Sequence, residues 1–421
     1  MLKIETLFKK ERIVNYDSSY LSEILDESLL KLDINGTELT SVGDNAFNHH
    51  LFKQLKHLNL ADNKLASLGS FRGLAQLSEL NLSANCLGSL ETSQFDELVN
   101  LSVLSLGKNQ LTELDDSQFS SLKHLLKLHL NDNQLTSIGS LNGLISLRVL
   151  DLANNHLSVV ADYQFENLPN LEMLNLSCNK LRHIERYSFY GLFRLKQLSL
   201  SSNCLDCLDE SYFEYAQSLE ILDLSMNKLT AVLNENTFKG LANLKQLHLW
   251  ENQIEAIRIG SFAHLSRLEQ LYLNYNRICR FDDENQQPNQ PSCLATLKVL
   301  NLSNNQLTRL NKTLLKSMLS LRELTLNSND FEQLDSSSLS LQNNLNVLSL
   351  SSNKLDSLVQ HQFLQLTNLV NLYLIHNQLT KLDAHTFEGL INLKKLNLHY
   401  NMLTELEALP AKAHSNQQSV H

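Results

Sequence analysis

The stretch Leu55-Lys-His-Leu58-Asn-Leu60-Ala-Asp-Asn63-Lys-Leu65 decides the fold of this chain, because the same phrase, Leu-x-x-Leu-x-Leu-x-x-Asn-x-Leu, returns through most of its 421 residues. The asparagines that close successive copies of the phrase are Asn63, Asn85, Asn109, Asn133, Asn155, Asn179, Asn203, Asn227, Asn252, Asn276, Asn305, Asn329, Asn353, Asn377 and Asn401. Most steps between them are 24 residues long. A fixed period of this length indicates a solenoid of stacked repeats.

The phrase has a physical cause in backbone geometry. Leu58 and Leu60 alternate with polar neighbours, which is the period of a strand with one face packed and the other in solvent. Asn63 follows where the chain must turn out of the strand, and its amide can satisfy backbone groups that the turn leaves without partners. Each repeat is therefore predicted to supply one short strand and one buried asparagine.

A second set of periodic residues supports the same register. An aromatic residue usually stands six positions before the first leucine of the next strand, at Phe71, Phe95, Phe119, Phe165, Phe189, Phe213, Phe238, Phe262, Phe363 and Phe387, with Leu141, Leu315 and Leu339 in its place elsewhere. We expect these side chains to form a core beneath the return segments on the convex side.

The extended phrase LxxLxLxxNxLxxLxxxxFxxLxxL resembles the typical class of leucine-rich repeat, and the resemblance runs from about Leu29 to Leu406. It implies an α/β solenoid, a leucine-rich repeat horseshoe with a parallel β-sheet on the concave face and irregular or short helical segments outside. Relatives of this class include Toll-like receptor ectodomains, chaoptin-like adhesion proteins and small proteoglycans, which mostly recognise proteins or carbohydrates. The class does not define the ligand.

The periodicity predicts one repeat domain with short flanking segments. Residues 29–410 hold about 16 repeats, in the first of which Thr37 replaces the asparagine. Residues 1–28 are predicted to be an N-terminal helical cap, because Leu21, Ile24 and Leu25 have helical spacing. An inserted loop at 278–294 accounts for the one 29-residue step, and 411–421 form a polar tail.

The ends of the chain and the cysteines bear on localisation. The charged N-terminal segment lacks the apolar stretch of a secretory signal, and no apolar run approaches 18 residues. Neither end carries the clustered cysteines that cap extracellular members of the class. These features predict a cytoplasmic protein as the chain stands, whereas an extracellular or cell-surface location is the alternative if the chain is incomplete.

Two pairs of cysteines are candidates for chemistry. Cys279 and Cys293 bracket the inserted loop, and a disulfide between them is the alternative to free thiols in an oxidising compartment. Cys204 and Cys207 form a Cys-x-x-Cys motif on the turn of an ordinary repeat. No second ligand pair accompanies this motif, so neither a metal site nor redox chemistry is expected there.

Solvent-facing strand positions are the candidate binding surface. Two sets of aromatic and histidine residues stand out there, namely His248, Trp250, Glu251, Tyr272 and Tyr275 on two neighbouring strands, and Tyr373, His376, His399 and Tyr400 on two later ones. Exposed rings on a rigid sheet are typical of binding hot spots, although such rings can also merely cover aliphatic neighbours. Basic and acidic residues are balanced on this face, which argues against nucleic acid as a partner.

We therefore predict a non-catalytic recognition scaffold with a protein partner on its concave face, or a carbohydrate or glycoprotein as the alternative. No catalytic motif occurs in its required context, and no cofactor, metal or membrane insertion is expected. The second reading is the ectodomain of a secreted or cell-surface receptor or adhesion protein in signalling or innate immunity. The third is the substrate-recognition subunit of an enzyme complex.

Overall fold

The computed structural model describes residues 15–16, 29–210, 212–230, 233–282, 294–335 and 337–406. They divide into two compact units, Met1–Cys204 and Leu205–His421, which are treated separately below as unit 1 and unit 2. Apart from Asn15–Tyr16, which form a short strand, the predicted N-terminal helical cap lies outside the described residues, as do most of the inserted loop and the polar tail. These three predictions are therefore untested.

Unit 1 is a stack of short parallel strands. In sheet order they are β2 (Lys31–Asp33), β4 (His57–Asn59), β5 (Glu79–Asn81), β6 (Val103–Ser105), β7 (Lys127–His129), β8 (Val149–Asp151), β10 (Met173–Asn175) and β12 (Gln197–Ser199). The outer side of the unit carries β1 (Asn15–Tyr16) paired with β3 (Ser41–Val42), β9 (Val159–Val160) paired with β11 (His183–Ile184), and the 3₁₀ turn η2 (His50–Phe52).

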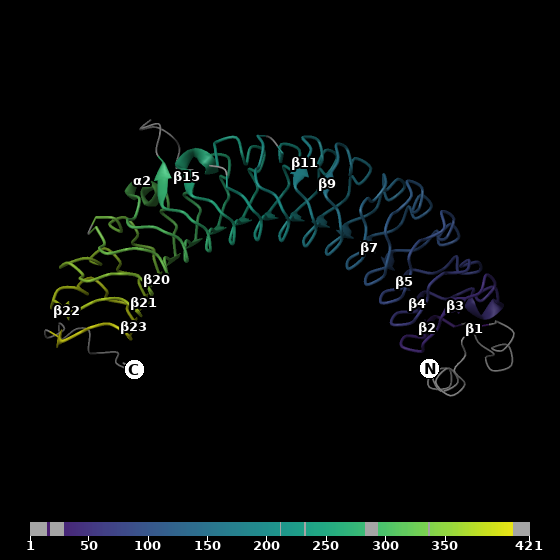
Figure 1. Cartoon of the computed structure of the whole chain (residues 1–421), viewed down its shortest axis with the longest axis horizontal. Coiled ribbons are helices and arrows are strands. Elements are labelled where there is room, and N and C mark those ends of the chain that lie inside the picture. The colour runs from purple at the N-terminus through teal and green to yellow at the C-terminus, as the bar shows by residue number, and fades with distance from the viewer. Residues whose placement is uncertain are drawn as a thin grey trace. The chain divides into compact units, whose positions relative to one another are not determined.

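Unit 2 repeats this plan. Its main strands are β13 (Ile221–Asp223), β14 (Gln246–His248), β16 (Gln270–Tyr272), β18 (Val299–Asn301), β19 (Glu323–Thr325), β20 (Val347–Ser349), β21 (Asn371–Tyr373) and β23 (Lys395–Asn397). The outer side has β15 (Ala256–Arg258) with β17 (Arg280–Asp282), β22 (Lys381–Leu382) with β24 (Glu405–Leu406), η3 (Ile259–Phe262) and α2 (Lys312–Lys316). Figure 1 shows the main strands of each unit on its concave side.

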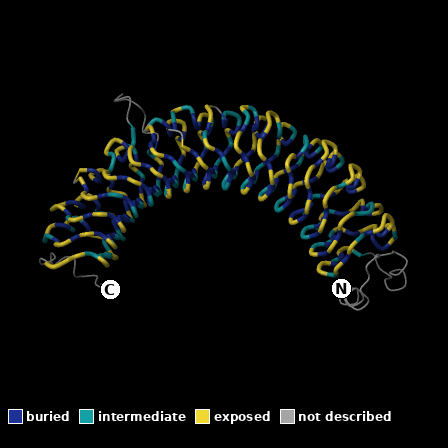
Figure 2. Tube along the Cα trace, viewed as in Figure 1, coloured by how far each residue is buried: buried dark blue, intermediate teal, exposed yellow. Residues whose placement is uncertain are grey.

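The strands pair in the register that the repeated phrase predicts. Within each unit, the central leucine of each main strand pairs with the central leucine of the next, as Leu247 does with Leu271. It is buried in every main strand except β23, where Leu396 is only partly buried, and its strand neighbours mostly reach the solvent side. Buried residues form an internal band in each unit, with exposed residues toward the turns (Figure 2). The predicted solenoid with a parallel sheet is therefore confirmed.

The asparagine ladder joins each repeat to the one before it. Asn179 Nδ2 donates to the carbonyl oxygen of Leu152 in the preceding repeat at 3.0 Å and to that of Leu176 in its own repeat at 3.1 Å. Its Oδ1 accepts from the backbone N–H of Leu157 at 3.0 Å. The asparagine thus satisfies a buried donor and two buried acceptors, which confirms the role predicted for it.

The aromatic spine is also confirmed. Phe95 lies between Phe71 and Phe119 with ring centroids 6.1 and 6.0 Å away, and all three side chains are buried. Phe363 stacks on Phe387 at 6.2 Å, and Phe387 is only partly buried. The core therefore has two columns, leucines beneath the strands and phenylalanines beneath the return segments.

Candidate functional site

The first candidate cluster lies on β14, β16 and the turns that follow them. We call it the tryptophan cluster: His248, Trp250, Glu251, Tyr272 and Tyr275. His248 and Tyr272 are register partners, and their rings stack with centroids 4.7 Å apart at an interplanar angle of 24°. The structure therefore brings together these two residues as the sequence predicted.

Hydrogen bonding and burial define the electrostatic state of this pair. The Tyr272 hydroxyl donates to Gln270 Oε1 at 2.9 Å. Burial lowers the pKa of His248, and the carboxylate of Asp223 on β13 opposes this effect without cancelling it. Burial also raises the pKa of Tyr272, with a smaller contribution from Glu323. Both rings are therefore uncharged near neutral pH and offer apolar faces with polar edges.

Trp250 and Tyr275 lie in the turns after the two strands. Trp250 is partly buried, and its carbonyl oxygen accepts from the backbone N–H of Met226 at 2.9 Å. Tyr275 is 57% exposed and has a backbone φ of 56°. Glu251 occupies the equivalent position one repeat earlier, with φ 55°. Because a bulky residue is rare in this left-handed region, the tyrosine ring is presented to solvent at some conformational cost.

The second candidate cluster, the tyrosine–histidine cluster, contains Tyr373, His376, His399 and Tyr400. The rings of His376 and Tyr400 stack with centroids 4.2 Å apart and an interplanar angle of 1°, and His399 meets Tyr400 edge-on at 6.2 Å. Lys395 Nζ lies 5.1 Å from the ring centroid of Tyr373. Tyr400 is 72% exposed, so this cluster is more open than the tryptophan cluster.

The two clusters are separate patches on the same face of unit 2. Three strands, β18, β19 and β20, lie between β16 and β21. At ~4.8 Å per strand, Tyr272 and Tyr373 are ~19 Å apart along the sheet. The positions between them in the same row are polar, namely Asn301, Thr325 and Ser349.

The inserted loop cannot be placed against the tryptophan cluster, since residues 283–293 lie outside the described residues. This range includes Cys293, so the disulfide between Cys279 and Cys293 remains a prediction. Cys279 itself is exposed, and its thiol donates to the carbonyl oxygen of Glu255 at 3.5 Å.

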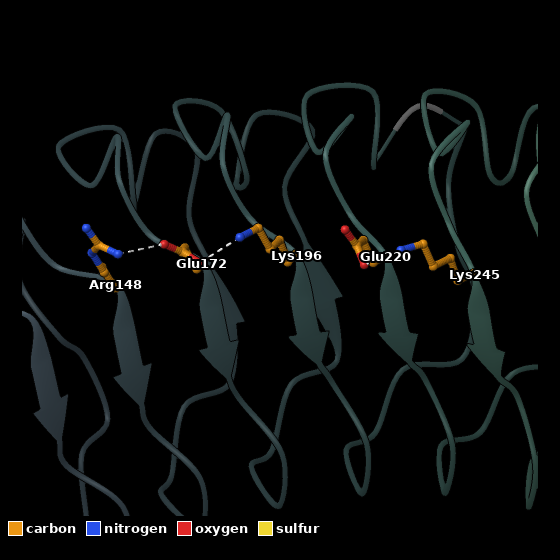
Figure 3. A network of polar contacts seen from close by, with 5 residues as sticks. All are labelled: Arg148, Glu172, Lys196, Glu220 and Lys245. Carbon is orange, nitrogen blue, oxygen red and sulfur yellow. Dashed lines mark hydrogen bonds and ion pairs between the residues drawn. The ribbon is translucent and has the colours of Figure 1, made fainter.

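Ion pairs form a row on the strand side, and the partner of each charged residue in it was not predicted from the sequence. In unit 1, the carboxylate of Glu172 forms ion pairs with Arg148 at 3.4 Å and with Lys196 at 2.8 Å (Figure 3). The hydrogen bond from Lys196 is the main cause that lowers the pKa of Glu172. In unit 2, Lys245 pairs with Glu220 at 2.8 Å. All of these residues stand just before a strand, so alternating charge at that one position of successive repeats was the available signal.

These ion pairs are exposed to solvent, which screens the attraction between the charges, so they contribute little to stability. They pair the charged side chains on this face with one another, so these charges are not left unpaired for a partner. The equal numbers of basic and acidic residues on this face therefore reflect, in part, ion pairs between neighbouring repeats.

Two further observations concern chemistry and membranes. Among the described residues, no group of three or more histidine, cysteine, aspartate or glutamate side chains is arranged to hold a metal ion. Within the same residues, no helix has the length and apolar character needed to cross a membrane.

Comparison with protein families identifies the class. A family model described as leucine rich repeat matches residues 27–87, 99–157, 145–205, 194–254, 217–278, 320–379 and 367–409, and a second leucine-rich repeat model matches 296–318. These matches cover more than half of the chain. The chain belongs to the leucine-rich repeat family.

Solved structures with the same fold come from several sources. In the TLR13–ssRNA13 complex, the receptor chain is 29% identical with a TM-score of 0.72, over 89% of this chain and 51% of that one. A leucine-rich repeat protein of Leptospira interrogans is 27% identical with a TM-score of 0.64, over 93% and 95%. In the Drosophila Toll–Spatzle complex, the matching chain is 18% identical with a TM-score of 0.73, over 93% and 55%.

The present chain thus spans about half the length of the two receptor chains and nearly the full length of the bacterial protein. Comparison with curated protein sequences finds no match. Because one relative is solved with single-stranded RNA, the fold does not exclude nucleic acid, and the expectation drawn from charge balance remains a prediction.

Proposed function

We propose that this chain is a non-catalytic scaffold that binds a protein partner on the concave face of unit 2, with the tryptophan cluster at the centre of the contact. The observation that carries the proposal is the stacked, uncharged His248–Tyr272 pair, flanked by Trp250 and the exposed Tyr275. The tyrosine–histidine cluster supplies a second contact on the same face.

Rigid placement is the physical reason to favour binding over simple coverage of aliphatic neighbours. The rings are held by the sheet, so a partner would gain large contact area with little loss of rotamer freedom. Tyr275, His376 and Tyr400 all occupy left-handed turn positions, with φ of 56°, 54° and 56°. Equivalent positions in most other repeats hold small or polar residues such as Asp62, Ala84 and Ser202, which meet the needs of the turn alone, whereas Met226 is apolar and 41% exposed.

A protein is favoured over nucleic acid because the His248–Tyr272 pair is uncharged and two lysines beside it are engaged. Lys245 pairs with Glu220, and Lys298 pairs with Glu269 at 2.8 Å. A phosphate backbone would have to compete with these carboxylates. The complex of Toll with Spatzle is an example of a relative of this fold with a protein partner.

The second candidate is the ectodomain of a receptor. It is favoured by the likeness to TLR13 and Toll, of which this chain spans 51% and 55%. Both candidates use the same face, so the same variants test the binding site. A longer transcript that encodes a signal peptide or a membrane anchor would decide in favour of the receptor.

Affinity capture from a lysate, with mass spectrometry of the bound proteins, tests the site. The wild-type chain is compared with the triple variant Trp250→Ala, Tyr272→Ala, Tyr275→Ala. The matched control is Val359→Ala, Leu364→Ala, Ile391→Ala, which removes three apolar side chains in unit 2 that are 50%, 41% and 79% exposed and lie outside the main strands.

We expect a partner that binds the wild type and the control and is lost from the cluster variant. Each substitution of Trp250 or Tyr272 should weaken binding of that partner by roughly 2 kcal/mol, with the melting temperature close to that of the wild type. Equal capture by all three proteins would contradict the proposal. If the cluster variant loses its folded structure together with its binding, the rings are structural.

A further inference from the structure

Unit 1 carries a second group of aromatic side chains that the proposed function does not use. We call it the tyrosine patch: Tyr163, Tyr187, Tyr190 and Phe193. Tyr163 and Tyr187 stack with ring centroids 5.4 Å apart and an interplanar angle of 6°. Tyr190 meets Tyr163 edge-on at 5.5 Å and Phe193 edge-on at 6.1 Å. The four rings therefore form one continuous surface.

The patch is open to solvent. Tyr163 is 45% exposed, Tyr190 is 37% exposed and Phe193 is 58% exposed. Tyr163 and Tyr187 follow β9 and β11 by three residues, and these small strands lie on the outer side of unit 1 (Figure 1). The patch is thus built on return segments and not on the strands of the main sheet.

The core of the solenoid does not require these rings. The phenylalanines of the spine in the same two repeats, Phe165 and Phe189, are fully buried and complete the packing there. Tyr163 and Tyr187 each stand two residues before a phenylalanine of the spine. In two other repeats the same position holds a serine, Ser93 or Ser117, so the fold does not need a ring there. Tyr163 also has a φ of 60°, a left-handed conformation that the equivalent residues Gly139 and His361 share at 57° and 59°, so a bulky ring stands at a turn position where glycine serves in another repeat.

An open surface depression of about 600 Å³, which we call the acidic cavity, adjoins the patch. Tyr163 lines it together with the carboxylates of Asp115, Asp116, Asp162 and Glu166, and none of the described residues that line it is basic. Two of these carboxylates are oriented by backbone donors, because Asp116 Oδ1 accepts from the N–H of Ser140 at 2.8 Å and Asp162 Oδ1 from that of Tyr187 at 2.7 Å.

The chemistry of the surface defines what it would bind. Fixed carboxylates beside tyrosine faces attract a cationic side chain, through charge and through the ring quadrupole. The Arg186 guanidinium carbon already lies 5.6 Å from the centroid of Tyr187, so one of these rings is in contact with a cation within the chain itself. Tyr190 and Phe193 continue the surface with apolar area.

We propose that the tyrosine patch and the acidic cavity together form a second docking surface, for a protein segment that carries lysine or arginine next to an apolar side chain. The cation enters the cavity and the apolar side chain lies on Tyr190 and Phe193. This surface goes beyond the proposed function, because it belongs to unit 1 and to its return segments. The acidic cavity disfavours the phosphates of nucleic acids and of anionic membranes.

Selection of peptides from a displayed random library against the full chain tests this inference without a known partner. The enriched peptides are then measured by fluorescence anisotropy against two sets of variants. The ring variant is Tyr163→Ser with Phe193→Ser. The charge variant is Asp115→Asn, Asp162→Asn and Glu166→Gln, in which each replacement keeps a hydrogen-bond acceptor.

Matched controls come from other repeats. Val99→Ser and Leu319→Ser remove apolar side chains that are 46% and 51% exposed and stand at the repeat position of Phe193. Thermal unfolding of every variant, followed by circular dichroism, shows whether it is folded. Tyr272→Ala, in the concave face of unit 2, separates this surface from the proposed binding site.

We expect enriched peptides with lysine or arginine beside an apolar residue. Their affinity should fall at least about tenfold with the ring variant and with the charge variant, and should be unchanged with the controls and with Tyr272→Ala. Enrichment of acidic or uncharged sequences, equal binding to the folded ring variant, or loss of binding only with Tyr272→Ala would overturn the inference. It would also be overturned if RNA or anionic vesicles bound this surface and displaced the peptides.

Discussion

The asparagine ladder makes a quantitative prediction about coupling between repeats, because neighbouring asparagines share a carbonyl oxygen. Leu302 O accepts from Asn305 Nδ2 at 3.0 Å and from Asn329 Nδ2 at 2.9 Å. Asn329 Oδ1 also accepts from the buried N–H of Leu307 at 3.0 Å. Removing one asparagine therefore leaves the shared carbonyl with one partner, whereas removing both leaves it with neither.

The magnitude follows from these contacts. Asn329→Ala leaves the Leu307 N–H without its acceptor, which costs about 1–3 kcal/mol, and loses hydrogen bonds worth about 0.5–1.5 kcal/mol each to Leu302 and Leu326. We expect a loss of about 3 kcal/mol in the free energy of unfolding. Asn305→Ala should cost a similar amount, and the double variant should lose about 1–3 kcal/mol more than the sum, because the carbonyl of Leu302 is then buried and unsatisfied.

Urea unfolding of the four proteins, followed by far-ultraviolet circular dichroism, measures this coupling free energy. A control cycle uses Asn305→Ala with Asn353→Ala, since Asn353 donates to Leu326 and Leu350 and shares no carbonyl with Asn305. That pair should be additive within about 0.5 kcal/mol. Equal coupling in the two cycles, or none in the first, would refute the reasoning from the shared carbonyl.

Three further predictions concern single side chains. Burial holds the pKa of His248 below its value in the unfolded chain. The stability that this histidine contributes is therefore complete above about pH 6.5 and is lost as the pH falls through the lowered pKa. In melting experiments across this pH range, His248→Gln should lose less melting temperature on acidification than the wild type. Burial is the main cause that raises the pKa of the Cys207 thiol to about 11, so iodoacetamide should modify it at neutral pH far more slowly than the exposed Cys86, and mass spectrometry showing equal rates would contradict this. Phe119→Ala, which removes a buried ring stacked on Phe95, should cost about 3–5 kcal/mol in urea unfolding, and a cost below about 1 kcal/mol would show that the spine is not a packed core.

The fold was predictable because its determinants are local and recur. Leu58 and Leu60 define a strand, Asn63 defines the turn after it, and every later repeat confirms the same register. Stacking then follows, since one repeat cannot bury its own leucines. The row of solvent-facing positions was predictable for the same reason, and it placed His248 next to Tyr272.

Other features depend on residue positions that the repeated sequence pattern does not specify. Glu172 could pair with either neighbouring repeat, and the structure shows that it meets both Arg148 and Lys196. The tyrosine patch depends on the left-handed backbone of Tyr163 in a return segment, where the repeat phrase has no required residue. Residues 283–293 interrupt the period, so no neighbouring repeat indicates their conformation.

We propose that the concave face of unit 2 contacts a protein partner through the tryptophan cluster. The most direct measurement is photo-crosslinking with p-benzoylphenylalanine placed at Tyr275, which is 57% exposed, and in a matched protein at Leu364, which is 41% exposed and lies in a return segment. We expect a crosslinked protein partner from the substitution at Tyr275 and none from that at Leu364. Crosslinks from Leu364 alone, or the same products from both positions, would contradict it.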